Sequence, residues 1–304
     1  MRWRDFALGL TLLLILGSIG SLAFRGLNLG LDFEGGLLVE ARASAPVDVG
    51  KLRDKLGRLG LGEVVIQSYG GAREVLIRVH QPPEAAEQDR SAAVRAALGS
   101  EYDIRRIEFV GPQVSRDLLI SGLEASGLAV VLIAAYVWFR FEWQFGISAL
   151  ITTLHDVVAI FGLFSLFGME FNLTVVAAIL TVAGYSINDT IVVFDRVREN
   201  LRRYKKMGLV ELINLSVNQT LSRTLMTAGT TMLAILSLLV FGGPVLRNFS
   251  AALAWGVFIG TYSSIFVASV LLLYMPKIKG MEGQATASGG EGGPAAVKGA
   301  VGDP

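Results

Sequence analysis

The sequence predicts a polytopic α-helical membrane protein with six transmembrane helices and one small α+β domain between the first two. Of its 304 residues, 52% are hydrophobic and only 17% are charged, and the apolar residues gather in six segments. A bilayer-spanning helix needs about 20 mostly apolar residues, because about 30 Å of hydrocarbon is crossed at roughly 1.5 Å per residue. The segments that qualify are Phe6–Phe24, Leu118–Phe139, Phe145–Phe167, Phe171–Val193, Leu221–Phe241 and Phe249–Tyr274.

The first apolar segment follows Arg2 and Arg4 and so has the outline of a secretory signal peptide. Its apolar stretch exceeds the roughly 7–15 residues of a signal-peptide core. We therefore expect residues 1–27 to hold a short N-terminus and a retained membrane anchor.

Residues 28–112 interrupt the apolar pattern and should form one small domain. Their alternating hydrophobicity gives the order β-α-β-β-α-β, the ferredoxin-like arrangement, which serves many functions and specifies none. We expect His80, at the end of one of its strands, to lie at the surface. The expected elements are strands at Leu37–Ala43, Glu63–Tyr69, Glu74–His80 and Asp103–Val110, and helices at Val49–Leu59 and Pro83–Leu98.

Residues 113–276 contain the other five spans and a basic loop at 196–220. Lys and Arg gather in cytoplasmic loops, and the opposite short loops offer only Arg247, so we expect both termini in the cytoplasm and the α+β domain outside it. The basic run would also contact anionic membrane lipids. Apolar residues at helical spacing from Leu209 to Val217 predict a short amphipathic helix on the inner surface. The basic residues are Arg196, Arg198, Arg202, Arg203, Lys205 and Lys206.

Composition excludes several classes of function. The net charge of +1 argues against nucleic acid as a partner, and the absence of cysteine excludes disulfides, thiol nucleophiles and cysteine-bound metals. There is no HExxH metal motif and no GxGD motif of an intramembrane aspartyl protease, and Ser148 with His155 makes a weak case for a hydrolase. We expect no enzyme activity and no metal site.

Residues 277–304, rich in Gly and Ala, are expected to form a disordered cytoplasmic tail.

Five ionisable residues fall in or at the edge of the predicted spans, where a charged side chain costs about 2.5–3.5 kcal/mol on insertion scales. They are Glu124, His155, Asp156, Asp189 and Arg223. Asp156 shares a helix face with Thr152 and Thr153, so it either makes a polar contact between helices or is a second proton relay station. His155 diverges from it by about 100° on a helix, so we expect the two on different faces.

Asp189 belongs to a polar or small stripe along the fourth span, which we expect to face the bundle interior. Arg223 and Thr227 lie on a matching face of the fifth span, and antiparallel packing would bring Arg223 to the depth of Asp189. The stripe consists of Thr181, Gly184, Tyr185, Asn188, Asp189 and Arg196.

Two interpretations of Asp189 and Arg223 stay open on these observations. In the first, a buried salt bridge fixes helix register, or Arg223 extends to the lipid headgroups. In the second, movement of Arg223 changes the proton affinity of Asp189, which couples ion flow to motion.

Several segments resemble signatures of the SecD/SecF protein-export family. Residues 29–36, LGLDFEGG, resemble its LGLDFxGG signature, which includes Asp32, Gly35 and Gly36. Residues 110–114, VGPQV, are similar to its VGPxV element, with Gly111 and Pro112. Residues 184–199 resemble a GYSxNDT…FDRxRE segment typical of the SecF branch, with Tyr185, Asn188, Asp189, Asp195 and Arg196 at matching positions.

The resemblance covers about residues 6–276 and implies an RND-superfamily fold, in which two six-helix halves are related by an axis along the membrane normal. This chain would be one half and SecD the other, with the SecYEG channel, YajC and the translocating preprotein as further partners. The family uses proton-motive force, with protons as the coupling ion and no other cofactor, and the resemblance assigns that role to Asp189 and Arg223. It implies a bacterial cytoplasmic (inner) membrane protein. A passive scaffold of the channel, or half of an exporter of lipids or small molecules, remains an alternative.

Overall fold

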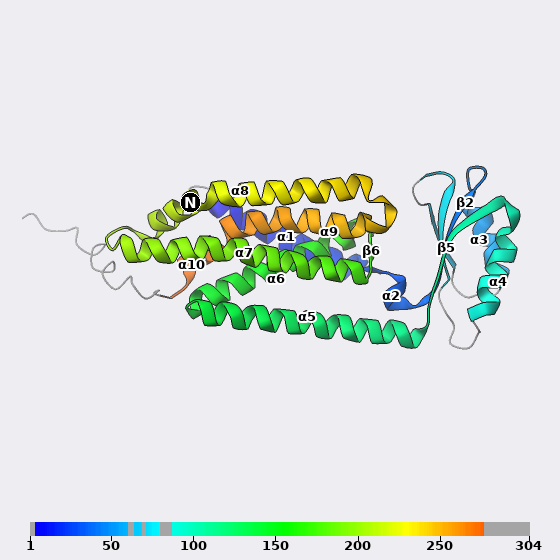
Figure 1. Ribbon diagram of the computed structural model, residues 1–304, viewed down its shortest axis with the longest axis horizontal. Coiled ribbons are helices and arrows are strands. Elements are labelled where there is room, and N and C mark those ends of the chain that lie inside the picture. The colour runs from blue at the N-terminus through cyan, green and yellow to red at the C-terminus, as the bar shows by residue number, and fades with distance from the viewer. Residues whose placement is uncertain (1–3, 60–63, 69–70, 80–86, 277–304) are drawn as a thin grey trace, which may run out of the picture.

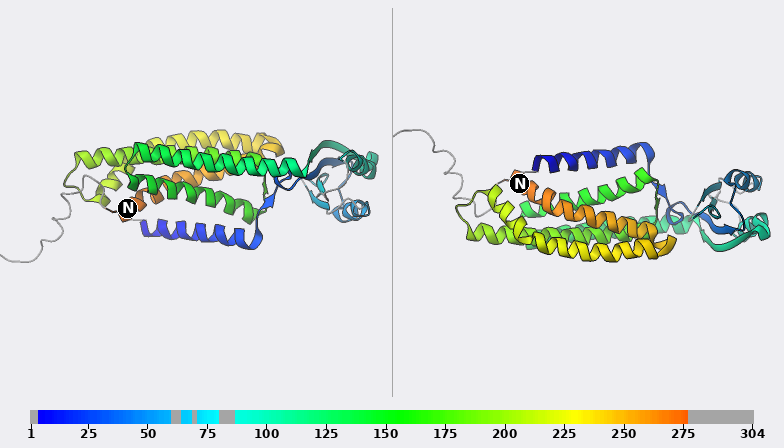
Figure 2. Two further views of the ribbon diagram at one scale, coloured as in Figure 1. Left: turned by 90° about the horizontal axis from the view of Figure 1, so that it is seen from below. Right: turned by 90° about the horizontal axis from the view of Figure 1, so that it is seen from above.

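The computed structural model describes residues 4–59, 64–68, 71–79 and 87–276. Long helices run side by side, and a small α+β domain stands at one end of them (Figure 1). We call this the domain end of the bundle and the opposite end, where α1 begins and α7 finishes, the basic end (Figure 2). The predicted fold class is confirmed.

Among the described residues, six helical spans are long and apolar enough to cross a membrane. Helices suit this environment because they satisfy their backbone hydrogen bonds internally. The sixth span is interrupted by a π-helical turn. The spans are α1 (Arg4–Arg25), α5 (Pro112–Arg140), α6 (Trp143–Phe167), α7 (Leu173–Arg203), α8 (Leu209–Phe241) and the series α9 (Gly243–Ser263), η2 (Ser264–Ala268) and α10 (Ser269–Tyr274).

The fourth and fifth spans are longer than predicted, and the basic loop expected at 196–220 is mostly helical. Helix α7 continues to Arg203, and α8 begins at Leu209, so only residues 204–208 connect them. The predicted amphipathic surface helix is the first part of α8. Its Leu212 and Ile213 are fully buried, in one core cluster with Val197 of α7, so this apolar face packs on protein.

The α+β domain has the predicted element order. Its antiparallel sheet runs β3-β4-β2-β5, and helices α3 and α4 contribute to a core centred on Val39 and Ile77, which pair across β2 and β4. The elements are β2 (Gly36–Ala43), α3 (Val49–Gly57), β3 (Val64–Ser68), β4 (Glu74–Val79), α4 (Glu87–Leu98) and β5 (Tyr102–Val110), with a 3-10 turn η1 (Gly99–Glu101) before β5. His80 and the predicted start of the second helix at Pro83 lie outside the described residues, as does the predicted tail.

A short joint that the sequence did not reveal connects the domain to the bundle. Strand β1 (Asn28–Leu29) pairs in parallel with β6 (Glu170–Phe171), which lies between α6 and α7. The short helix α2 (Leu31–Glu34) follows β1 and leads into β2. The domain is thus tied to the α6–α7 connection as well as to the ends of α1 and α5.

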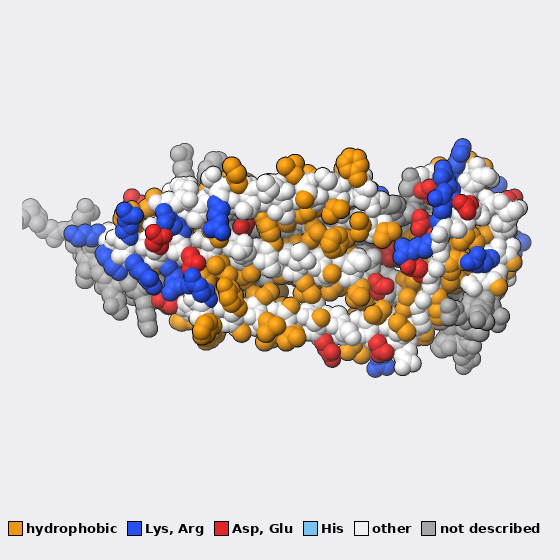
Figure 3. Space-filling model, viewed as in Figure 1, with side chains coloured by type: hydrophobic (Ala, Val, Ile, Leu, Met, Phe, Trp, Pro, Cys, Tyr) orange, Lys and Arg blue, Asp and Glu red, His pale blue; other side chains and the backbone are white. Residues whose placement is uncertain are grey.

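Apolar and charged side chains occupy different parts of the molecular surface on the face shown in Figure 3. Apolar side chains cover the bundle between its ends, whereas Lys and Arg gather at the basic end and over the domain (Figure 3). This distribution is what a bilayer around the bundle requires, because uncharged surface meets hydrocarbon and charged surface meets water.

Candidate functional site

Asp189 is a buried carboxylate in the membrane part of α7. Only 3% of the residue is exposed, and its Oδ2 atom has no hydrogen-bond partner among the residues that the structure describes. It lies 14 residues before Arg203, the last residue of α7, which places it about 21 Å from the basic end.

Arg223 lies on α8 about one helical turn closer to the basic end than Asp189 and does not pair with it. The contacts of Asn200 with Ser216 and of Arg196 with Gln219 set the register of the two helices, and Arg223 lines a groove together with Val192. In the described part of the chain no ion pair joins it to Asp189. Its exposed side chain instead lines a groove of about 300 Å³ between α7 and α8. The other lining residues are Val192, Asp195, Arg196 and Glu199 of α7 and Gln219 and Thr220 of α8.

The polar stripe of α7 does not face the interior as predicted. Thr181, Gly184 and Asn188 are exposed and Tyr185 is half-buried, so Asp189 is the one member of the membrane part of the stripe that is buried. The apolar face of α7 forms the core instead. Periodicity separates two helix faces, but in a membrane both lipid and protein are apolar neighbours, so it does not decide which face turns inward.

Thr227 is also exposed, on α8. Its hydroxyl donates to the backbone carbonyls of Arg223, at 3.1 Å, and Thr224, at 3.0 Å. Thr227 and Asn188 therefore belong to a polar outer surface of the α7–α8 pair rather than to the shell around Asp189.

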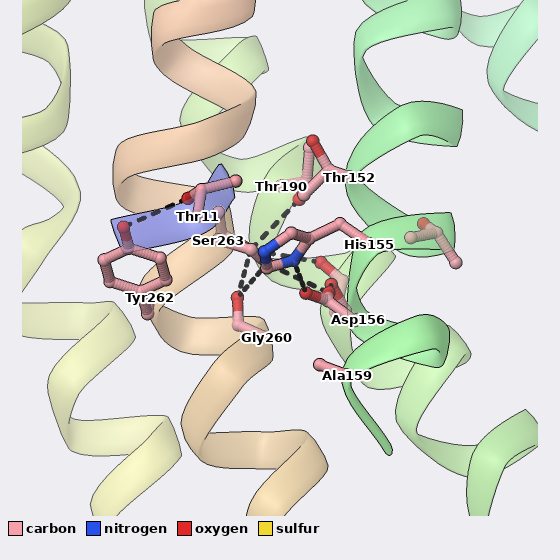
Figure 4. Close-up of polar contacts among 12 residues, drawn as sticks. Thr11, Thr152, His155, Asp156, Ala159, Thr190, Gly260, Tyr262 and Ser263 are labelled. Atoms are coloured by element: carbon pink, nitrogen blue, oxygen red, sulfur yellow. Dashed lines mark hydrogen bonds and ion pairs between the residues drawn. The ribbon is translucent and has the colours of Figure 1, made fainter. Parts of the chain in front are cut away.

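Asp156 forms a second polar centre, where α6, α7 and α9 meet (Figure 4). It is fully buried, and its Oδ2 atom accepts hydrogen bonds from Ser186 of α7, at 2.5 Å, and Ser263 of α9, at 2.9 Å. The polar contact between helices that the sequence left open is therefore present. Thr152 and Thr153 do not take part, because their hydroxyls donate to backbone carbonyls within α6.

The side chain of His155 meets Asp156, which the helical angle between successive residues did not suggest. Nδ1 of the imidazole lies 2.9 Å from Oδ1 of Asp156, and both residues are buried. Ser148, weighed above as a nucleophile, donates to the carbonyl of Ala268 at 2.9 Å. The described residues contain no group of three or more His, Asp or Glu that could hold a metal ion.

Asp32 of the LGLDFEGG segment contacts the start of α7. Its Oδ2 atom accepts a hydrogen bond from the backbone N–H of Leu173, at 2.8 Å, at the first residue of α7. The first N–H groups of a helix have no partner within the helix, so Asp32 satisfies one of them from a distant segment.

Gly35 and Gly36 of the same segment lie where a side chain would strain the backbone or clash with its neighbours. Gly35 has φ +71° and Gly36 has φ +120°, a backbone region that disfavours other residues. A Cβ on Gly35 would lie 3.0 Å from Oγ of Ser115 and 3.2 Å from the carbonyl of Val110. At the second junction Gly111 is the N-cap of α5 and Pro112 its first residue, where the missing N–H of proline does no harm.

Arg78 and Glu170 form a mostly buried ion pair between the domain and the bundle. Arg78 also donates to Asn28, at 3.3 Å, and Asn248 of α9 donates to the carbonyl of Glu170, at 3.1 Å. Burial raises the pKa of Glu170 above its ordinary value of 4.5, and the Arg78 guanidinium opposes that shift. Sequence reasoning missed this pair, although an arginine within the apolar strand EVLIRV was a signal for it.

Asp195 and Arg196 lie at the basic end on the last turns of α7. Asp195 accepts two hydrogen bonds from Arg140 of α5, at 2.9 and 3.0 Å, and Arg196 contacts Glu199, at 2.5 Å, and Gln219 of α8, at 2.7 Å. These charged residues therefore tie α7 to α5 and to α8.

Comparison with known proteins accounts for these motifs together. Residues 90–278 match the family described as protein export membrane protein SecD/SecF, C-terminal, and residues 20–47 match the SecD/SecF GG motif. The chain belongs to the SecD/SecF family. It is 45% identical to the protein translocase subunit SecF of Pseudomonas aeruginosa and 41% identical to that of Rickettsia felis, each over 276 residues that cover 90% of both chains.

Two crystal structures of SecDF resemble the fold. The structure of SecDF from Thermus thermophilus, a translocon-associated membrane protein, matches with a TM-score of 0.83 and 40% identity over 90% of this chain. SecDF in a super-membrane-facing form matches with a TM-score of 0.63 and 38% identity. This chain spans 38% of the length of each SecDF chain. The GG-motif match includes Asp32, Gly35 and Gly36, the joint residues described above.

Proposed function

We propose that this chain is a subunit of the Sec protein-export machinery that works with SecD and uses proton-motive force to promote preprotein translocation and release outside the cytoplasm. The observation that carries the proposal is Asp189, a buried carboxylate with an unpartnered oxygen in the membrane part of a SecD/SecF-family bundle. A carboxylate in this setting changes the charge of the bundle by one when it binds or releases a proton. One proton crossing a potential of 100 mV delivers about 2.3 kcal/mol.

The groove between α7 and α8 supports a proton route to Asp189 from the basic end. All of its lining residues except Val192 are polar or charged, and Val192 lies one helical turn from Asp189. Arg223 lines the same groove about one helical turn from Asp189, so a movement of its guanidinium would change the electric field at the carboxylate. In this proposal Arg223 is the mobile partner of Asp189, while Asn188 and Thr227 border the route.

The exposed polar face of the α7–α8 pair supports a second membrane partner. Thr181, Gly184 and Asn188 of α7 and Thr227 and Thr230 of α8 are exposed although they lie in spans. Small and polar residues on membrane helices favour close contact with other helices over contact with lipid. SecD, which would contribute another six helices, is the proposed partner on this face, in keeping with the larger SecDF chains that this chain matches in part.

The proposed orientation follows the distribution of Lys and Arg. The basic end holds Arg198, Arg202, Arg203, Lys205 and Lys206, so it would face the cytoplasm together with both termini, and the α+β domain would lie outside. The membrane would be the bacterial cytoplasmic (inner) membrane, with anionic lipids at the basic end. The SecYEG channel, YajC and the preprotein complete the proposed set of partners, and the proton is the coupling ion.

The experiment compares Asp189→Asn with wild type in membrane vesicles that contain SecD and the export channel. Asparagine is nearly isosteric with aspartate but does not bind protons, so assembly should survive while the response of export to an uncoupler is lost. Asp117→Asn, at an exposed carboxylate of α5, is the matched control. Export with an unchanged uncoupler response in Asp189→Asn would instead favour a passive scaffold.

A half-exporter of lipids or small molecules predicts a different result in the same vesicles. Lipid or small-molecule flux would then depend on Asp189, and preprotein export would not. Measuring both fluxes in one preparation separates these functions.

A further inference from the structure

We propose that His155 and Asp156 form a second proton-binding site in the bundle, at which Nε2 of His155 takes up the proton. The proposal extends the proton-coupled function proposed above, but it rests on a different set of contacts. Both residues are buried, with 5% of His155 and 0% of Asp156 exposed, and Figure 4 shows the imidazole and the carboxylate side by side.

In this proposal Asp156 is the ionised acceptor of the pair and His155 is the donor. Its Oδ2 atom accepts from two serine hydroxyls, Ser186 and Ser263, and its Oδ1 atom lies 2.9 Å from Nδ1 of His155. An ionised carboxylate only accepts hydrogen bonds, so this set of contacts fits an ionised Asp156 and a His155 that carries its proton on Nδ1. A carboxylate that orients an imidazole in this way is a recurrent device for fixing its tautomer.

The assignment leaves Nε2 of His155 as a lone-pair acceptor. This atom is buried and has no hydrogen-bond partner in the structure. Proton uptake converts the Nε2 lone pair into an N–H bond, and no other bond changes. The net charge of the pair goes from −1, for neutral imidazole and carboxylate, to 0, for imidazolium and carboxylate.

The change in charge would act on the contact between α7 and α9. The single hydroxyl proton of Ser263 has two acceptors, Oδ2 of Asp156 at 2.9 Å and the carbonyl of Gly260 at 3.1 Å. Ser264, the first residue of η2, lies 3.0 Å from the hydroxyl of Thr190 on α7 and donates to the same Gly260 carbonyl at 2.8 Å. Such π-helical turns often occur at functional sites, and this one begins beside the ionisable pair.

The surroundings contain few other titratable groups. On α7, Asp189 lies one turn beyond Ser186, and Tyr185 is its other titratable neighbour. On α9, Tyr262 donates to the carbonyl of Ala7 in α1, at 2.7 Å. Within the described residues, α1, α5, η2 and α10 place no charged side chain in hydrogen-bond contact with His155 or Asp156. Asp189 is therefore the one nearby carboxylate whose titration must be separated from that of the pair.

The chain allows a direct test because its sequence contains only two histidines. His80→Gln leaves His155 as the single imidazole, and ¹⁵N-histidine labelling of the full chain in lipid bilayers then gives its tautomer and charge by solid-state NMR. We expect a proton on Nδ1 in the neutral form and a second proton on Nε2 in the low-pH sample of a series recorded from about pH 8 to 5. Asp156→Asn in the same background should abolish the preference for Nδ1. A neutral form with its proton on Nε2, or an imidazole that stays neutral throughout this range, would overturn the proposal.

Proton counting gives a second readout. His155→Gln should bind about one proton fewer per chain than wild type after a jump from about pH 8 to 5, whereas His80→Gln loses only the proton of a second, independent site. The two losses should add in the double variant. An unchanged proton count in His155→Gln contradicts the proposal. If His155 titrates as expected and Asp189→Asn leaves export unaltered, only the function proposed above fails.

Discussion

The carboxylate of Asp32 accepts a hydrogen bond from the backbone N–H of Leu173, 2.8 Å away and 141 positions later in the chain. This contact joins the segment that leaves α1 to the first residue of α7, the helix that carries Asp189. Asn172, the N-cap of α7, accepts from the N–H of Val175 at 3.2 Å, so two side chains cap the same helix. The start of α7 is therefore fixed in part by the junction to the domain.

Replacing Asp32 should loosen the first turn of α7. Asp32→Ala removes the acceptor of the Leu173 N–H, and losing a helix cap typically reduces stability by about 1 kcal/mol. Asp32→Asn keeps an acceptor oxygen and should retain most of that stability. Hydrogen exchange at residues 173–176 and thermal unfolding in lipid nanodiscs measure the effect. Equal protection of this turn in wild type and Asp32→Ala would contradict the assigned cap.

Glu170 should contribute a pH dependence to stability. Its pKa is raised above 4.5 by burial, so the folded chain holds this proton more tightly than the unfolded chain. The resulting stability is present in full below about pH 4.5 and is lost as pH rises through the raised pKa. Glu170→Gln should lack this decline, whereas Glu211→Gln, at an exposed residue of α8, should keep it. Thermal unfolding as a function of pH tests the sign, and an increase of stability with pH in this window in wild type alone would refute it.

Arg78 and Glu170 should be strongly coupled in a double-mutant cycle. Arg78→Met leaves the Glu170 carboxylate without its ion pair in a mostly buried site, and breaking a buried pair typically costs about 3–5 kcal/mol. Arg78→Met combined with Glu170→Leu removes both charges and should cost less than the sum of the two corresponding single changes. Additive losses in the free energy of unfolding would mean that the pair does not hold the domain to the bundle.

Gly162 should be essential for the crossing of α1 and α6. A Cβ at this position would lie 2.0 Å from Oγ of Ser18, so Gly162→Ala must push the helices apart. The hydroxyls of Ser21 and Ser165 lie 2.9 Å apart in the same contact, and the chain has no cysteine, so Ser21→Cys with Ser165→Cys should form a disulfide on oxidation. Adding Gly162→Ala should reduce its yield, and adding Ser18→Gly as well should restore it only in part, because the new methyl group would still lie 2.8 Å from Cα of residue 18. A yield that Gly162→Ala leaves unchanged would show that the crossing tolerates a methyl group.

Asp195 should matter little for stability despite its two hydrogen bonds to Arg140. Both side chains are 43% exposed, and ion pairs in such positions contribute about 0–1 kcal/mol. Asp195→Asn should therefore change the free energy of unfolding by no more than this amount, and high salt should weaken the wild-type contribution. A much larger loss would point to a role of the pair beyond a surface contact.

The sequence was most informative where one strong physical requirement acts along the chain. Hydrocarbon thickness sets the length of a span, and strand alternation sets the element order of the α+β domain. Both predictions were confirmed. Asp189 could also be singled out, because a carboxylate within a span always requires an explanation. Helix ends were less predictable, since α7 and α8 continue beyond the hydrocarbon, where packing of Leu212 and Ile213 rather than lipid holds the helix.

By itself, the sequence determined the six spans, the inserted α+β domain and the short list of ionisable residues in the membrane. Only the tertiary structure decided which of them meet: His155 with Asp156, Asp32 with the start of α7 and Arg78 with Glu170. It also decided that the polar stripe of α7 lies outward and that, among the described residues, no ion pair joins Arg223 to Asp189. The physical reason is that periodicity depends on neighbours along one helix, whereas these relationships depend on which helices pack together, and lipid and protein offer an apolar helix face the same kind of surroundings.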